Sequence, residues 1–174
     1  MKWVKVFILI LIILGLSSTA LYVIPWAHRI DTTIQGIQCR IGEDKYIENV
    51  TVRIKGIYDQ YLFKADNFEG SIEISNYDYT QDWQMDRLRF HGNSASIMYH
   101  KVSKNGELKV NYLGEIYCTQ DMKKLMICIY EENGEGIGWD AGSGVFISAP
   151  SIDRDQAIET AKTLTKDWLA EWFQ

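Results

Sequence analysis

The chain contains little of the material from which catalytic and metal sites are built. Its 174 residues include three cysteines, three histidines and two prolines. The cysteines form no C-x-x-C pair and the histidines form no ligand pair, so the common zinc patterns are excluded. A G-x-S-x-G turn, the nucleophile elbow of α/β-hydrolases, is also missing. The sequence therefore predicts no metal and no cofactor, and it favours a protein that is not an enzyme.

Clustered positive charge is scarce as well. Two of the 18 basic residues precede residue 6 and all 23 acidic residues follow residue 26, so the chain beyond residue 26 carries a formal net charge of −7. Binding to a phosphate backbone requires clustered lysine and arginine side chains. We therefore predict that nucleic acid is not a partner.

What the chain does have is a long apolar run at its beginning. Residues 6–26 carry no charge, and Lys2 and Lys5 precede them. A helix of about 20 apolar residues matches the ~30 Å hydrocarbon core of a bilayer. Lysines before such a span favour a cytoplasmic N-terminus. Residues 1–26 are therefore predicted to be a signal anchor with a single transmembrane helix, which makes the membrane a partner through residues 6–26.

This prediction places the remainder of the chain outside the cytoplasm, at the cell membrane. The same run also fits a cleaved signal peptide, because Ser18-Thr19-Ala20 matches a small-x-small cleavage site. In that alternative the protein is secreted after cleavage near Ala20. The first reading leaves a single-pass protein with a cytoplasmic N-terminus and an extracytoplasmic C-terminal domain.

Beyond the anchor, the hydrophobic pattern predicts a β domain. Residues 27–46 are predicted to be a polar stalk that leads into IQCRIGE, a candidate first strand, and residues 47–57 begin a series of runs with period-two alternation. From Asp153 the period changes to 3.6, which predicts an amphipathic helix over residues 153–173. We expect a mainly β (α+β) extracytoplasmic domain over residues 47–174. Its architecture is an antiparallel meander sheet or partly closed barrel packed by this one C-terminal helix.

The strongest turn signal is Asn105-Gly106, which lies between two alternating runs. A two-residue type I′ hairpin turn needs positive φ at both central residues, and this dipeptide supplies it. In that register Tyr99 faces Tyr112. We therefore expect the following residues to share one face: Ile97, Tyr99, Leu108, Val110 and Tyr112.

Cys118 and Cys128 lie on two apolar runs that a tight hairpin would bring nearly opposite each other. In an oxidising exterior they could form a disulfide, and Cys39 would remain unpaired. The alternative is that all three cysteines are small buried apolar residues. Both readings stay open from the sequence.

The candidate binding segment is NYDYTQDWQMD, over residues 76–86. Aromatic rings stack on sugar rings or anchor protein interfaces, and carboxylates accept hydrogen bonds from hydroxyl groups. The alternative is a loop whose rings pack onto the sheet edge while the acids face water. The candidate binding residues are Tyr77, Tyr79, Trp83, Asp78 and Asp82.

Material for acid-base chemistry is limited to His91 and His100 with Asp86 or Asp82 nearby. An envelope hydrolase would need these side chains to converge within hydrogen-bond reach. The envelope hydrolase is therefore an alternative hypothesis, and no residue is predicted to be catalytic.

We therefore expect a non-enzymatic binding or interaction module at the cell envelope, whose partner is another envelope protein or a cell-wall glycan. A domain that binds a small ligand, a glycan or a lipid, is the alternative from a second class. The layout resembles that of small signal-anchored surface proteins of Gram-positive bacteria. This resemblance concerns architecture and transfers no functional residues.

Overall fold

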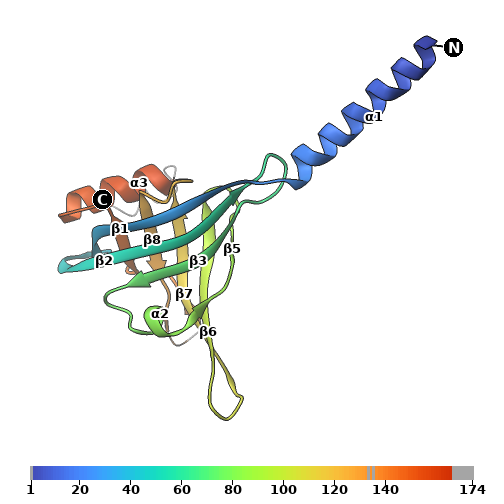
Figure 1. Cartoon of the computed structure of the whole chain (residues 1–174). Coiled ribbons are helices and arrows are strands. Elements are labelled where there is room, and N and C mark those ends of the chain that lie inside the picture. Colours follow the sequence, from blue (N-terminus) through green and yellow to red (C-terminus); the bar gives the residue numbers. More distant parts are fainter. Residues whose placement is uncertain (1, 133, 135, 166–174) are drawn as a thin grey trace.

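A computed structural model describes residues 2–132, 134 and 136–165 of the chain (Figure 1). The described helices are α1 (Lys2–Val23), the short α2 (Tyr79–Asp82) and α3 (Arg154–Thr165). The described strands are β1 (Trp26–Arg40), β2 (Glu43–Gln60), β3 (Asn67–Ile74), β4 (Gln84–Met85), β5 (Leu88–Arg89), β6 (Ser94–Val102), β7 (Leu108–Cys118), β8 (Leu125–Ile129), β9 (Glu131–Glu132), β10 (Ile137–Gly138) and β11 (Val145–Ala149).

Nine of these strands form one curled antiparallel sheet, in the order β4-β6-β7-β8-β11-β1-β2-β3-β5. β9 and β10 pair as a separate ribbon. The sheet curls into a half-barrel, and α3 lies against its outer face (Figure 1). The predicted mainly β fold with one C-terminal helix on the sheet is confirmed.

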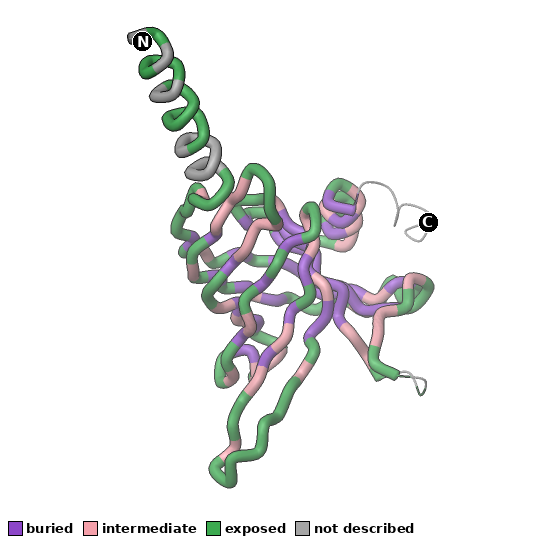
Figure 2. Tube along the Cα trace, turned by 90° about the vertical axis from the view of Figure 1, so that its right-hand side faces the viewer, coloured by how far each residue is buried: buried purple, intermediate pink, exposed green. Residues whose placement is uncertain are grey.

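The inner face of the half-barrel holds the main core. On β2, Val50, Val52 and Ile54 are buried and alternate with more exposed polar residues, because successive side chains of a strand point to opposite faces. The rings of Phe68 and Tyr99 fill the same core from other strands. Figure 2 shows the burial concentrated in the middle of the sheet, with exposure increasing towards its ends.

A second core lies between the outer face and α3. Ala157 and Ala161 are fully buried there, and these small side chains allow the helix backbone to come close to the sheet. The helix begins as the sequence predicts, because the Asp153 carboxylate accepts a hydrogen bond from the Gln156 amide at 2.8 Å. The predicted helix ran to residue 173, and residues 166–173 lie outside the described part of the chain.

α1 occupies most of the predicted anchor over residues 1–26. Among the residues that the structure describes, no helix combines the length and the hydropathy needed to cross a bilayer. The structure therefore gives the predicted transmembrane helix no support. The membrane location of this segment stays a prediction.

The predicted stalk over residues 27–46 is wrong, because most of it belongs to β1. This strand pairs with β2 along its whole length, from Trp26 opposite Gln60 to Arg40 opposite Glu43. Two inward-facing residues, Ile30 and Ile34, are buried in the core. The large apolar residues before Ile37 are widely spaced, so the alternation predicts only the end of this strand, in the run IQCRIGE.

The predicted register of the β6–β7 hairpin is also wrong. The turn is a three-residue loop, Lys104-Asn105-Gly106, in which the Gly106 amide donates to the Ser103 carbonyl at 2.9 Å. Gly106 has a φ of +83°, whereas Asn105 is not among the described residues with positive φ. A type I turn followed by one left-handed residue produces this loop. Val102 therefore pairs with Leu108, and Tyr99 pairs with Asn111 instead of Tyr112.

A β-bulge further along the hairpin changes the faces a second time. Ile97 pairs with Gly114 and Met98 pairs with Tyr112, so Leu113 is the extra residue. Leu113 points into the inner core, and the alternation of β7 is reversed beyond it. Leu108, Val110 and Tyr112 thus lie on the outer face, whereas Ile97 and Tyr99 are fully buried on the inner face.

The predicted disulfide between Cys118 and Cys128 is not formed, and all three cysteines are free and buried. Cys118 pairs with Leu125, so Cys128 lies three residues further along β8. An odd offset places the two thiols on opposite faces of the sheet, one in each core. The alternative reading, that the cysteines are buried apolar residues, agrees with the structure.

Candidate functional site

The predicted aromatic segment lies at one end of the half-barrel, around α2. Its three rings are half-buried and pack against the inner core. The Tyr79 ring lies edge-on to Tyr99, with the centroids 5.6 Å apart, and 5.9 Å from the Trp83 ring. Asp78 and Asp82 remain exposed to solvent. The rings are therefore engaged in packing, as the alternative reading expected.

Polar contacts fix this segment further. The Tyr77 hydroxyl donates to the Gln38 side-chain oxygen at 3.0 Å, and the Gln38 amide nitrogen donates to the Tyr46 hydroxyl at 2.9 Å. Burial raises the pKa of Tyr77, and it raises the pKa of Tyr79 to about 12. Both phenols are thus neutral at physiological pH. A glycan-stacking role for Tyr77, Tyr79 and Trp83 stays a prediction.

The histidines are not brought together. His100 Nδ1 lies 2.6 Å from Asp86 Oδ1, and both side chains are partly exposed. His91 forms an isolated bridge with Ser94, at the other end of β6. His100 lies six positions after Ser94 on β6, a separation of about 20 Å along the strand. The structure therefore assembles one histidine–carboxylate pair, and it does not assemble the convergent group that the hydrolase reading requires.

The β6–β7 hairpin carries an exposed apolar surface that the sequence did not predict. Its members are 43% to 64% exposed and lie at outward-facing positions on both strands. Large side chains exposed together in this way mark interaction sites on soluble domains. We name this surface the outer strip, and it consists of Val102, Leu108, Val110 and Tyr112.

The hairpin extends well beyond the body of the sheet, as a green exposed finger in Figure 2. β4 pairs with β6 at His100 and Tyr99, and the β8 ladder begins at Gly114 of β7. Between these limits and the loop, the ladders of the described strands place no neighbour on either edge of the ribbon. Unpaired strand edges present rows of N–H and C=O groups that can bond to another chain.

The opposite face of the same ribbon is polar and cationic. Lys101 pairs with Lys109 across the strands, and Lys104 lies in the loop. All three lysines are exposed. The finger therefore has one face that carries the outer strip together with His100. On the opposite face Lys101 and Lys109 outnumber the carboxylate of Glu107, and we name it the basic face, within a chain whose overall net charge is −5.

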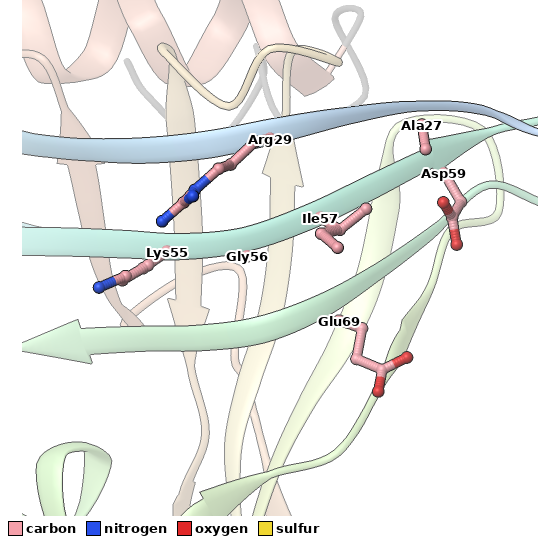
Figure 3. Close-up of a pocket in the computed structure, with 7 residues that line it drawn as sticks. All are labelled: Ala27, Arg29, Lys55, Gly56, Ile57, Asp59 and Glu69. Carbon is pink, nitrogen blue, oxygen red and sulfur yellow. The ribbon is translucent and has the colours of Figure 1, made fainter.

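A shallow hollow of about 650 Å³ lies on the outer face of β1, β2 and β3, where α3 does not cover the sheet. Figure 3 shows Arg29 and Lys55 extending towards one side of it, and Asp59 and Glu69 lying towards the other. Arg87 forms an ion pair with Glu69. The lining charges are of both signs and none of them is buried, so this hollow offers no buried polar group to select a ligand.

A smaller hollow of about 360 Å³ lies on the outer face near the base of the finger. We name it the aromatic hollow, and it is lined by Glu115, Tyr117, Cys128, Tyr130, Ile137 and Trp139. These residues come from β7, β8 and the segment that follows, and sequence reasoning did not bring them together. The available signal was the outward alternation of Glu115 with Tyr117 and of Cys128 with Tyr130.

Comparison with known proteins does not place this chain. No protein-family model, no curated protein and no solved structure matches it. Its function is therefore inferred from the geometry of its own residues.

Proposed function

We propose that this chain is a non-enzymatic interaction module that binds a protein partner through the outer strip of its β6–β7 hairpin. The observation that supports this proposal is the exposure of four large apolar side chains on one face of a projecting two-stranded ribbon. An isolated hairpin is marginally stable in water. A partner that covers the strip would therefore stabilise the ribbon as well as bind it.

The strip can supply a moderate binding free energy. Full burial of a large apolar side chain contributes about 1.5–3 kcal/mol. The strip residues are already about half covered, so a partner would gain roughly 1 kcal/mol from each and about 4 kcal/mol in all. Backbone hydrogen bonds to the open strand edges would add to this, as in β-augmentation. The partner surface is therefore an apolar protein face or an extended segment with apolar side chains.

The proposed location is the cell membrane, with the N-terminus in the cytoplasm and the β domain outside. The support is the uncharged run over residues 6–26 and the two lysines that precede it. In Figure 1, α1 leaves the sheet on one side and the hairpin projects on the other. In this arrangement the finger points away from the anchored end, so the proposed partner is another envelope protein.

The test uses a photoreactive amino acid placed at Val110 or at Lys109 of the full chain in intact cells. Adjacent residues of a strand point to opposite faces, so these two positions differ only in the face that they probe. We expect a discrete protein adduct from Val110 and none from Lys109. The substitution Leu108→Ser should reduce the Val110 adduct without changing the amount of the chain.

Equal adducts from both positions, or none from Val110, would contradict the proposed surface. An adduct of twice the chain's mass would identify the partner as a second copy of the same protein. The site is then the same strip, and the module is self-associating.

A further inference from the structure

The aromatic hollow is built from parts that are held in place by their own contacts. Glu115 and Tyr117 alternate on the outer face of β7, and Glu115 pairs with Cys128 across β7 and β8. The Trp139 indole Nε1 donates to the Val145 carbonyl at 2.8 Å. A Cβ on Gly144 would lie 2.4 Å from that nitrogen, so only glycine leaves room for the indole. The position of the Trp139 indole is therefore fixed, and the β7–β8 ladder sets the backbone positions of Glu115 and Cys128.

The loop that carries Trp139 is itself tied to the sheet. Arg40 forms a two-pronged ion pair with Glu131, at 2.7 Å and 3.0 Å. The same guanidinium donates to the Ser143 carbonyl at 2.9 Å. Bidentate arginine–carboxylate pairs are among the stronger and more directional polar contacts. The wall of the hollow is thus anchored on both sides of Trp139.

The electrostatic character of the hollow is uniformly electron-rich. Glu115 supplies a carboxylate, and Tyr117, Tyr130 and Trp139 supply aromatic rings, whose faces carry negative potential. None of the described lining residues is a lysine, an arginine or a histidine. Burial and the nearby Glu115 raise the pKa of the Cys128 thiol, so that thiol is neutral and unreactive.

We propose that the aromatic hollow binds a small organic cation, namely a quaternary ammonium group of the choline type. Aromatic rings attract such groups through cation–π interactions, and a nearby carboxylate adds charge attraction. A quaternary ammonium needs no hydrogen-bond acceptors, which suits a site whose lining is mainly aromatic and apolar and holds one carboxylate. A hard metal cation would require six to eight oxygen ligands, and the described residues contain no cluster that could hold a metal.

The first test titrates choline chloride into the full chain, solubilised in a maltoside detergent, and follows the indole signals by NMR. The matched control ligand is dimethylbutanol, the uncharged isostere in which carbon replaces the choline nitrogen. We expect saturable binding of choline that is about fivefold or more tighter than binding of the isostere. The Trp139 indole signal should shift, because that group forms a wall of the hollow.

Two variants and one control locate the site. Glu115→Gln keeps a hydrogen-bond acceptor and removes the charge, and Tyr130→Ala removes one ring. Each should weaken choline binding by about fivefold or more. Glu107→Gln changes an exposed carboxylate on the finger and should leave binding unchanged. Circular dichroism confirms that each variant is folded.

The absence of saturable choline binding overturns the proposal, as does equal binding of choline and the isostere. Unchanged affinity in the folded Glu115→Gln variant also overturns it. Phosphocholine, titrated in parallel, distinguishes two sources of the same group. If phosphocholine binds more weakly than choline, the ligand of the site is a free organic cation. If it binds equally or more tightly, the ligand is a lipid headgroup.

Discussion

Substitution of Gly114 by alanine tests the bulge that turns the outer strip towards solvent. A Cβ at this position would lie 1.8 Å from the Cys128 carbonyl oxygen and 2.9 Å from its carbon. β7 and β8 would have to separate by about 1 Å to relieve this contact. Gly114 also has a φ of +152°, a conformation that alanine adopts only with strain.

The expected loss of stability combines these two costs. Overpacking typically costs about 1–3 kcal/mol, and an unfavourable backbone conformation costs a further ~1–3 kcal/mol. We therefore expect Gly114→Ala to lower the free energy of unfolding by about 3–5 kcal/mol. This is a large fraction of the ~5–15 kcal/mol that stabilises a typical domain. In a domain of this size it corresponds to a fall in Tm of roughly 10 °C.

The measurement is urea denaturation followed by circular dichroism, with Gly138→Ala as the matched control. A Cβ on Gly138 meets no atom within 4 Å, and its φ lies outside the left-handed region. The control should change stability by less than about 0.5 kcal/mol. Equal midpoints for the two variants would refute the bulge and, with it, the outward direction of the strip.

Three further predictions concern packing, protonation and thiols. Tyr79→Ala should lower the free energy of unfolding, measured by urea denaturation, by about 3–5 kcal/mol, because its ring packs against Tyr99. An unchanged midpoint would show that the ring does not stabilise the core and would favour its predicted role in ligand binding. Hydrogen bonds from Thr119 and the Lys123 amide lower the pKa of Asp121 below 3.8, so its stabilisation is present above about pH 4 and lost on acidification. Asp121→Asn should therefore lose stability at neutral pH, and its difference from the parent should shrink as the pH falls below about 4. Burial raises the pKa of Cys118 to about 12, so a thiol reagent should label it only after unfolding; labelling of the native chain would contradict its burial.

Much of the fold is predictable from local patterns. The alternation around Val52 and the capping pair Asp153 and Gln156 each specify an element through neighbouring residues, and both predictions hold. The first part of β1 is not predicted because Ile30 and Ile34 are separated by polar residues, so it is recognisable only through its pairing with β2; the run IQCRIGE marks only the end of the strand. Local signals therefore predict elements well where the apolar residues are closely spaced.

The candidate surfaces were less predictable because they depend on register. Asn105-Gly106 is compatible with a two-residue or a three-residue loop, and the packing of Leu113 decides between the resulting faces. A shift of one residue moves every side chain of the finger to the other face. The segment around Tyr79 was predicted as a unit, and its packing against Tyr99 could not be inferred without the curl of the sheet. The aromatic hollow combines three segments that are distant in sequence.

The measurement that tests the central claim most directly is a comparison of Val110→Asp with Lys109→Asp in the full chain. Each chain is isolated from cross-linked cells, and co-isolated proteins are quantified by mass spectrometry. A charge at position 110 lies in the outer strip, whereas a charge at position 109 lies on the basic face. The account predicts that Val110→Asp loses the partner by about tenfold while Lys109→Asp retains it. Equal retention by both variants, or loss only with Lys109→Asp, would contradict it.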